Sequence, residues 1–246
     1  MDKTFDLYSK YYDLLYKDKD YEAEAKYVKT LLGENGTNIR DILELGCGTG
    51  RHAHLLNRAG YNVFGIDSSS SMLEQAKLIG VNCVKGDVRT FRADKTFDAV
   101  VSLFHVADYQ TSNDDLTDFF RTASVHLKSG GIFIFDCWYG PCVLNIKPEI
   151  RIKKLENENI SIRRTAIPTM HPNENIADVN YEIDIISDGN RYSSLKETHR
   201  MRYLFRPEIE LILKMTGFNL LKSEEWLSRK EPGSETWSVV FICEKT

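Results

Sequence analysis

One stretch decides the fold of this 246-residue chain: Leu43-Glu44-Leu45-Gly46-Cys47-Gly48-Thr49-Gly50. It continues a short, mostly apolar run over residues 41–45 and precedes a helical pattern over residues 51–59. Glycine at such a turn lets the backbone pass close to a ligand, and the N-terminus of the following helix offers free N–H groups. The stretch therefore predicts a strand, a ligand-binding turn and a helix in succession.

Apolar strands and helices alternate outward from this stretch. The strand patterns cover residues 41–45, 61–67, 81–85, 97–103 and 132–136, and the helical patterns cover residues 51–59, 70–79 and 114–126. This alternation predicts a parallel sheet with right-handed crossovers. Apolar and aromatic residues at helical spacing over residues 5–32, interrupted at residues 17–20, predict two further helices near the N-terminus.

The pattern changes to period two between residues 150 and 205. Alternating apolar and polar residues there predict antiparallel strands, and Asp188-Gly189-Asn190 is typical of a hairpin turn. We interpret residues 150–205 as an inserted antiparallel β lid, or substrate subdomain, within a domain formed by residues 1–149 and 206–246. After a helical pattern at 206–216, the strand patterns at 218–225 and 236–244 lie too close in sequence for a helical crossover, so we expect them to pair antiparallel.

Acidic residues stand where the first three predicted strands end. Ligands of parallel sheets bind at the carboxyl ends of the strands. Glu44 is suited there to a ligand ammonium or to structuring the loop, Asp67 to ribose hydroxyls, and Asp87 to the amino group of adenine. An NAD(P)-dependent oxidoreductase is disfavoured, because its fingerprint places the third glycine later and needs no acid after the third strand.

These residues resemble the class I S-adenosylmethionine (SAM)-dependent methyltransferases. The resemblance is carried by Glu44 through Gly50, Asp67, Met72, Asp87 and Ser102-Leu103-Phe104, and order and spacing agree as far as Cys137 and again over the C-terminal strands. It implies an α/β fold with a Rossmann-like, seven-stranded, mostly parallel sheet whose last strand is antiparallel. It also implies that SAM is bound, and S-adenosylhomocysteine released, by Tyr12, Tyr21, Glu44, Gly46, Cys47, Gly48, Gly50, Asp67, Ser68, Met72, Gly86, Asp87, Val88, Leu103 and Phe104.

A narrower resemblance concerns the acceptor of the methyl group. The segments Tyr12-Asp13, Lys19-Asp20-Tyr21, Asp136-Cys137-Trp138-Tyr139 and Glu197-Thr198-His199-Arg200 look like parts of N-methyltransferases of nucleotide-linked amino sugars. They imply a small-molecule acceptor, with the amine of such a sugar as the first expectation. The alternatives are an O-methyltransferase of surface-polysaccharide or other small-metabolite biosynthesis and, more remotely, a non-catalytic SAM-binding regulator.

The candidates for chemistry follow the fourth and fifth predicted strands. In the amino-sugar group a histidine occurs near the position of Tyr109, whereas this chain carries His105 four positions earlier. His105 is the first candidate for a base that deprotonates the acceptor, and Tyr109 and Tyr12 are further catalytic candidates. A purely structural role is the alternative for each of them. The candidate substrate-binding residues are Asp136, Trp138, Tyr139, Arg164 and His199, and the predicted lid also carries Arg163, Arg200 and Arg202, which are suited to a diphosphate.

Composition disfavours other classes of function. The formal net charge is −4, whereas nucleic-acid binders usually carry a basic excess, so we expect no nucleic-acid partner. No run approaches the roughly 20 apolar residues that span a bilayer, and the N-terminus has no apolar signal core, so we expect a cytoplasmic protein without a membrane partner. The five cysteines form no CxxC pair and no histidine–acid cluster has metal spacing, so we expect neither a metal nor a disulfide. The sequence leaves open whether the chain is a monomer or a homodimer.

Overall fold

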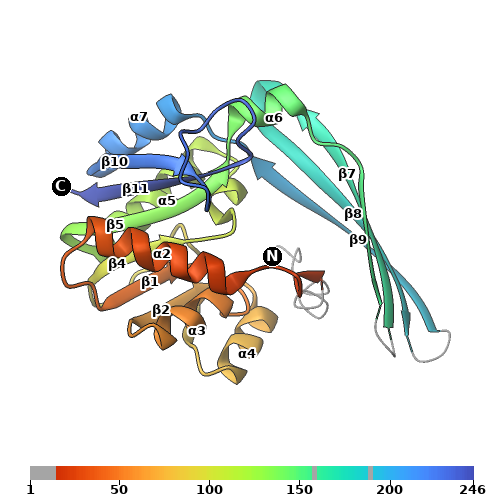
Figure 1. Ribbon diagram of the computed structural model, residues 1–246, viewed down its shortest axis with the longest axis horizontal. Helices are drawn as coiled ribbons and strands as arrows, with labels where there is room; N and C mark the ends of the chain where they lie inside the picture. Colours follow the sequence, from red (N-terminus) through yellow and green to blue (C-terminus); the bar gives the residue numbers. More distant parts are fainter. Residues whose placement is uncertain (1–14, 157–159, 188–190) are drawn as a thin grey trace.

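The computed structural model describes residues 15–156, 160–187 and 191–246 (Figure 1). Within these ranges the helices are α2 (Tyr21–Asn35), α3 (Arg51–Arg58), α4 (Ser70–Leu78), α5 (Asn113–His126), α6 (Gly140–Ile146), α7 (Arg206–Thr216) and the short 3-10 helices η1 (Val106–Tyr109) and η2 (Pro172–Glu174). The strands are β1 (Asp41–Leu45), β2 (Asn62–Asp67), β3 (Asn82–Lys85), β4 (Phe97–Ser102), β5 (Leu127–Trp138), β6 (Arg151–Glu156), β7 (Ile160–His171), β8 (Ile176–Ser187), β9 (Arg191–Arg202), β10 (Phe218–Glu225) and β11 (Ser238–Lys245). These strands form two separate sheets.

The larger sheet has seven strands in the order β10-β11-β5-β4-β1-β2-β3. Strands β1 to β5 run parallel to one another. Strand β11 pairs antiparallel with both β5 and β10, because the short connection from β10 to β11 cannot carry a helical crossover. This arrangement confirms the predicted Rossmann-like, mostly parallel sheet with an antiparallel last strand.

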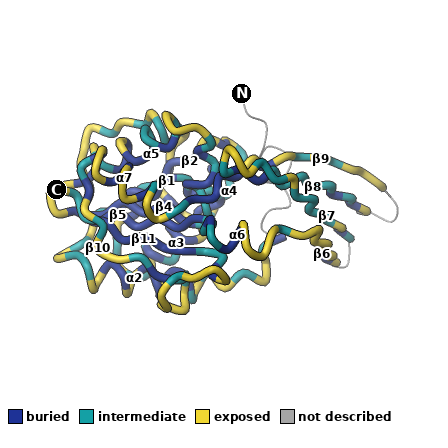
Figure 2. The backbone as a smooth tube through the Cα atoms, turned by 90° about the horizontal axis from the view of Figure 1, so that it is seen from above, coloured by how far each residue is buried: buried dark blue, intermediate teal, exposed yellow. Residues whose placement is uncertain are grey.

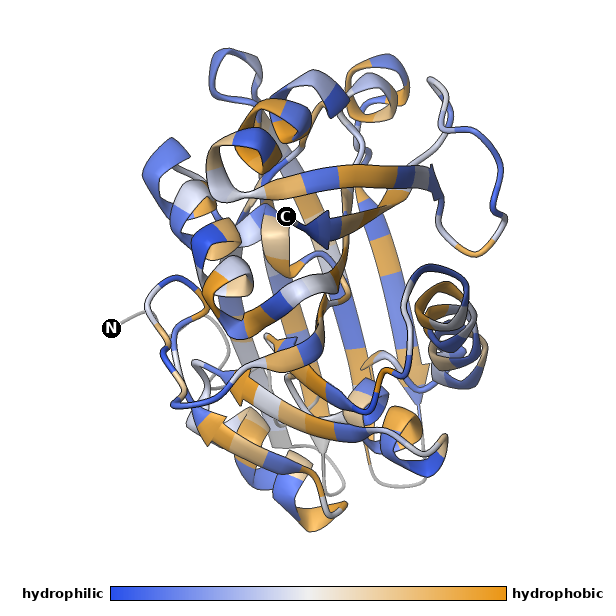
Figure 3. Ribbon diagram, turned by 90° about the vertical axis from the view of Figure 1, so that its left-hand side faces the viewer, coloured by the Kyte–Doolittle hydropathy of each residue, from blue (hydrophilic) through white to orange (hydrophobic). Residues whose placement is uncertain are grey.

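Helices cover both faces of the larger sheet. One core joins α2, α3 and α4 to one face, and a second core joins α5 and α7 to the other. Successive side chains of a strand point to opposite faces, so on β1 Ile42 belongs to the first core and Leu43 to the second. Figure 3 shows broad apolar bands along the strands between the helical layers. Burial on both faces accounts for the continuous apolar run Ile132-Phe133-Ile134-Phe135 in β5.

The smaller sheet, β6-β7-β8-β9, is wholly antiparallel and projects from the larger one as a long arm (Figures 1 and 2). Its described residues are mostly half-buried or exposed, in contrast to the buried strands of the larger sheet (Figure 2). Leu15 packs with Ile162 and Ile183 in a small cluster on one face of this arm. The predicted turn at residues 188–190 lies outside the described residues, although β8 and β9 on either side of it pair antiparallel as expected. That the arm acts as a lid stays a prediction.

The structure differs from the sequence prediction on both sides of residues 132–136. Strand β5 already begins at Leu127, because Leu127 pairs with Phe97 of β4. The register then shifts before pairing continues between Ala99 and Ile132, and Gly130 within this irregular stretch has a φ of +74°. After β5 the chain enters α6, which has seven residues and is therefore too short to show helical periodicity in the sequence. Pro141 in its first turn is compatible with a helix start.

The N-terminal region is described only in part. Helix α2 confirms the second of the two expected N-terminal helices, whereas most of the first, with Tyr12, lies outside the described residues. In the part of the chain that the structure describes, no helix is long and apolar enough to cross a membrane. All five cysteines are buried and unpaired.

Candidate functional site

The glycine-rich turn after β1 has a backbone that glycine adopts most easily. Gly46, Gly48 and Gly50 have φ values of +75°, +53° and +76°. A Cβ at Gly46 would lie 2.6 Å from Cγ2 of Val106, and a Cβ at Gly50 would lie 2.9 Å from the Cβ of Ala76. The turn therefore packs directly against the loop that follows β4 and against α4.

Asp67, at the end of β2, holds this turn in place. Its Oδ2 accepts a hydrogen bond from the backbone N–H of Gly48 at 2.8 Å, and its Oδ1 accepts one from Ser69 at 2.8 Å. Burial raises the pKa of Asp67, while these backbone donors oppose that rise. The carboxylate thus joins the turn after β1 to the loop after β2 and lies at the strand-end edge, as predicted.

Glu44, the penultimate residue of β1, is a buried acid with spare hydrogen-bonding capacity. Its residue is 1% exposed, and its Oε2 has no hydrogen-bond partner within the described structure. Burial, followed by the charge of Asp67, raises the pKa of Glu44 to about 8. A buried carboxyl oxygen without a partner is costly, so Oε2 can accept a further hydrogen bond at this position.

Asp87 lies where the sequence predicts it, but it already has a strong partner. Arg89 donates from Nε to Oδ1 at 2.9 Å and from its terminal nitrogen to Oδ2 at 2.6 Å, and it also reaches Asp115 at 2.7 Å. The Arg89 guanidinium lowers the pKa of Asp87. This role of Arg89 was not predicted from the sequence.

The predicted cofactor residues meet at one edge of the sheet. They are Glu44 to Gly50 after β1, Asp67 and Ser68 after β2, Gly86 to Val88 after β3, and Leu103 and Phe104 after β4, together with Met72 in the first turn of α4 and Tyr21 at the start of α2. The ring of Tyr21 lies 5.1 Å from that of His52 in α3, and Met72 is buried. Tyr12 lies outside the described residues.

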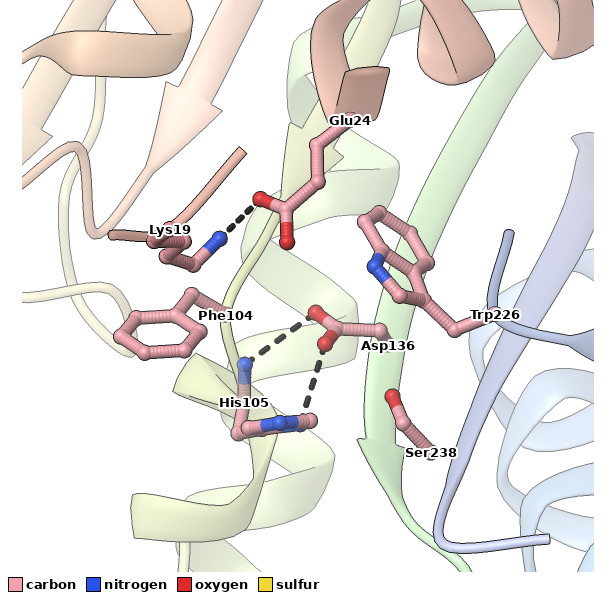
Figure 4. Close-up of a pocket in the computed structure, with 7 residues that line it drawn as sticks. All are labelled: Lys19, Glu24, Phe104, His105, Asp136, Trp226 and Ser238. Atoms are coloured by element: carbon pink, nitrogen blue, oxygen red, sulfur yellow. Dashed lines mark hydrogen bonds and ion pairs between the residues drawn. The ribbon is translucent and has the colours of Figure 1, made fainter. Parts of the chain in front are cut away.

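A pocket lies on the α2 side of the same edge (Figure 4). It is lined by Lys19, Glu24, Phe104, His105, Asp136, Trp226 and Ser238. The carboxylates of Glu24 and Asp136 point into it, and each has a basic partner (Figure 4). The Oγ atom of Ser238 is buried and has no hydrogen-bond partner within the described structure.

His105 is fixed in this pocket by strained backbone and by Asp136. Phe104 and His105 both have a φ of +65°, a left-handed conformation that costs about 1–2 kcal/mol for each such residue. The backbone N–H of His105 donates to Asp136 Oδ1 at 3.1 Å, and its ring Nδ1 lies 3.0 Å from Asp136 Oδ2, off the line of an ideal hydrogen bond. Burial alone would lower the pKa of His105, but the charges of Asp136 and Asp108 outweigh it and raise this pKa above 6.5.

Asp108 is a buried acid next to His105. Its Oδ2 accepts a hydrogen bond from the backbone N–H of Trp138 at 2.9 Å and lies 4.0 Å from Nδ1 of His105. Burial raises the pKa of Asp108 well above its usual value. Asp108 thus fixes the chain after Asp136, next to the ring of Trp138, which lies 6.3 Å from that of His105.

Glu24 is a second charged group on the wall of the pocket, and its place there was not predicted from the sequence. Glu24 pairs with Lys19 and lies 2.7 Å from Nε2 of His52. Burial opposes ionisation of Glu24, but His52 and Lys19 outweigh it and lower its pKa to about 2. The amino group of Lys19 lies 4.4 Å from the ring centroids of both Tyr21 and Phe104. A signal was present, because Glu24 adjoins Ala25 on the buried stripe of α2, where a lone acid needs a partner.

The other candidate residues lie away from the pocket. Tyr109 shares a hydrogen bond of 2.7 Å with Nδ1 of His199 and so joins η1 to β9. Arg164 lies between the rings of Tyr16 and Tyr181, at 5.6 and 4.9 Å. A further candidate, Tyr139, precedes α6, and its N–H donates to the carbonyl of Trp237 at 3.0 Å.

Comparison with known proteins points to one class of enzyme. Residues 42–131 match the family model of the methyltransferase domain. The dTDP-3-amino-3,4,6-trideoxy-alpha-D-glucopyranose N,N-dimethyltransferase of Streptomyces venezuelae is 31% identical over 53% of this chain and 56% of its own length, so this match spans little more than half of the relative. The putative methyltransferase YqeM of Bacillus subtilis is 27% identical over 96% of this chain and 94% of its own.

Solved structures share the fold over the whole chain. An S-adenosylmethionine-dependent methyltransferase from Clostridium acetobutylicum covers 98% of this chain and 98% of its own, with a TM-score of 0.81 and 22% identity, a likeness that concerns the fold. Together with the methyltransferase-domain match, which covers the glycine turn and reaches into β5, it shows that residues 42–131 match a methyltransferase domain and that the chain has the fold of such enzymes.

Proposed function

We propose that this enzyme transfers the methyl group of SAM to the amine of a nucleotide-linked amino sugar. The observation that carries the proposal is the pair of His105 and Asp136 in a pocket beside the glycine turn. The loop that bears His105 also bears Val106, which packs against Gly46. A base in this loop would therefore be close to a methyl donor held by the turn.

Features of the strand-end edge support SAM as the donor. The glycine turn has no room for a side chain at Gly46, the unpartnered oxygen of Glu44 is suited to the donor's ammonium, and Asp67 is suited to its ribose hydroxyls. The other predicted cofactor residues, with Asp87 near adenine, belong to the same proposal. Bound there, SAM would supply a methyl group on a positively charged sulfur.

The chemistry requires the acceptor to lose a proton. A protonated amine has no free electron pair, so it cannot attack the methyl carbon until a base removes a proton. In the proposed reaction His105 takes that proton on Nε2, the ring nitrogen that does not face Asp136, and Asp136 stabilises the resulting imidazolium. The new N–C bond forms as the C–S bond breaks, and the products are the methylated ammonium and S-adenosylhomocysteine.

The acidic and aromatic walls of the pocket suit an amine, and Lys19 pairs with Glu24 on the same wall. These walls combine the carboxylates of Glu24 and Asp136 with the aromatic rings of Phe104 and Trp226. Carboxylates and aromatic faces both attract an ammonium group. The relative from Streptomyces venezuelae is likewise named for methylation of an amine.

Methyl transfer to matched acceptors tests the proposal. The enzyme is incubated with SAM and a panel of nucleotide-linked amino sugars, each paired with the analogue that has a hydroxyl in place of the amine, and products are detected by mass spectrometry. We expect one or two added methyl groups on amines only. Methylation of the hydroxy analogues alone would instead indicate the O-methyltransferase. If no product forms although calorimetry shows SAM binding, the proposed acceptor class is wrong and the assignment of SAM as the methyl donor still stands.

A further inference from the structure

Two tryptophans meet beside the pocket, at the ends of β5 and β11. Trp138 and Ser238 are partners across these strands, so Trp138 shares a face of the sheet with the pocket-lining Ser238. The ring of Trp138 lies 5.6 Å from that of Trp237 and 6.3 Å from that of His105. The two half-buried indoles thus lie between the pocket and the start of the arm.

Arg151, the first residue of β6, lies over Trp237 of this pair. Its guanidinium carbon is 5.8 Å from the ring centroid of Trp237, and its side chain is exposed. In the described ranges no carboxylate lies within ion-pair distance of Arg151. By contrast, other arginines of this region are neutralised: Arg200 pairs with Glu174, Arg202 with Glu208 and Arg206 with Glu210.

An exposed guanidinium beside an aromatic pair suits a nucleotide. A guanidinium fork binds phosphate oxygens through two parallel hydrogen bonds, and an indole face stacks on a nucleobase. The adenine of SAM does not need this site, because its expected place beside Asp87 follows β3, at the far end of the sheet from β11. A second nucleotide is therefore the ligand that fits.

We propose that Arg151, Trp237 and Trp138 form the binding site for the nucleoside diphosphate of the acceptor. This inference rests on the proposed function, since it assigns the part of the acceptor that does not react. The diphosphate contacts Arg151 and the base stacks on the Trp237 indole, with the Trp138 ring, tilted by 59° to it, at its side. The sugar then enters the pocket past Ser238, whose unpartnered Oγ offers it a hydrogen bond.

Calorimetry with thymidine 5′-diphosphate tests the site without catalysis. Saturating S-adenosylhomocysteine is present in every titration, so that the probe cannot occupy the cofactor site. We expect Arg151→Gln and Trp237→Ala each to weaken binding of the probe about tenfold, and Trp237→Phe to retain most of it because a ring remains. The affinity for S-adenosylhomocysteine should not change in any of these variants, which shows that each one folds.

Arg163 provides the matched control. Arg151 is the register partner of Ala166, so Arg163, three residues before Ala166 on β7, lies on the opposite face of the arm and, contrary to the expectation from the sequence, outside the proposed diphosphate site. Arg163→Gln should therefore bind the probe as the unaltered enzyme does. Equal binding by Arg151→Gln, Trp237→Ala and Arg163→Gln, or no binding by the unaltered enzyme at millimolar probe, would overturn the inference.

The two proposals can fail separately. If nucleotide-linked amino sugars are methylated but Arg151→Gln binds the probe normally, only the placement of the nucleotide is wrong. If no such sugar is methylated but the probe binds and depends on Arg151 and Trp237, the nucleotide site stands and the amino-sugar acceptor is wrong.

Discussion

The two halves of the strand-end edge are built differently. Around β1, β2 and β3 the proposed cofactor residues come from one continuous segment, and Asp67 holds the turn through backbone N–H groups. The pocket beside β4, β5 and β11 instead combines Glu24, His105, Asp136 and Ser238, which are far apart in the sequence. The proposed cofactor site can be encoded in turns that are local in the sequence, whereas the proposed acceptor site depends on the packing of elements that lie far apart in the sequence.

The largest effect is expected in the acceptor half. His105→Asn should lower kcat about 100- to 1000-fold, because it removes the proposed base. Its affinity for SAM, measured by calorimetry, should change little. His171→Asn is the matched control, since His171 also pairs with an aspartate, Asp178 at 2.9 Å, but on the arm. Equal turnover by both variants would show that the pocket histidine is structural.

The pH profile checks the same base. Because Asp136 and Asp108 raise the pKa of His105 and the base must be unprotonated, kcat/KM should rise with pH through a value above 6.5. In Asp136→Asn the remaining rise should move to lower pH, because burial then lowers this pKa with less opposition. An unshifted profile in Asp136→Asn would argue that another group titrates.

The next largest effect is expected on stability, at the contact between Gly46 of the cofactor half and Val106 of the acceptor half. Gly46→Ala should destabilise the fold by about 3 kcal/mol, since it adds left-handed strain to a clash with Val106. Gly48→Ala keeps the strain but places its Cβ in open space, so it should cost only about 1–2 kcal/mol. Denaturant unfolding measures both. Adding Val106→Ala should restore part of the loss in Gly46→Ala, and no restoration would mean that the contact is unimportant.

Asp67 tests the cofactor half alone. Asp67→Asn should weaken SAM binding by about 1.5–3 kcal/mol, because ribose hydroxyls and the turn lose a charged acceptor. Asp98→Asn is the control, since Asp98 also accepts from two backbone N–H groups, of Arg40 and Asp41, both at 2.9 Å, but at the start of β4, away from the strand-end edge. Calorimetry compares the two, and equal affinities would remove Asp67 from the site.

Glu44 predicts a pH dependence of SAM binding. Its pKa of about 8 means that it is mostly protonated at pH 7 without ligand, whereas an adjacent ammonium would ionise it. SAM should therefore bind more tightly as pH rises from 6 to 8, by up to about tenfold per unit, and then level off. Titrations at several pH values measure the slope, which Glu44→Gln should abolish. If the affinity of Glu44→Gln for SAM still depends on pH, a group other than Glu44 releases the proton on binding.

The smallest effect is expected where η1 meets the arm. Tyr109→Phe loses the hydrogen bond to His199 and should cost about 1 kcal/mol of stability, measured by denaturant unfolding. Its kcat should stay near that of the unaltered enzyme, because the hydroxyl binds His199 of β9 and Tyr109 does not line the pocket. A loss of kcat as large as that of His105→Asn would return Tyr109 to the catalytic candidates.

The elements could be predicted wherever a short-range pattern exists. The alternation of strands and helices predicted the larger sheet, and period two predicted the arm, because side chains on regular elements repeat at fixed intervals. Helix α6 has too few residues for such a repeat, and the early start of β5 depends on pairing with β4 across the irregularity at Gly130. Both differences arise from interactions that a local window does not contain.

The sequence by itself determined the class of fold and the glycine turn, because strand, turn and acid are encoded within a few residues of one another. It also singled out His105 and Asp136, but not that they pair. Only the tertiary structure decided that pairing, the approach of Lys19 and Glu24 to the pocket, and the place of Arg151 over Trp237. The physical reason is that charges and rings act over a few ångströms in space, and packing alone brings residues so far apart in the chain to that distance.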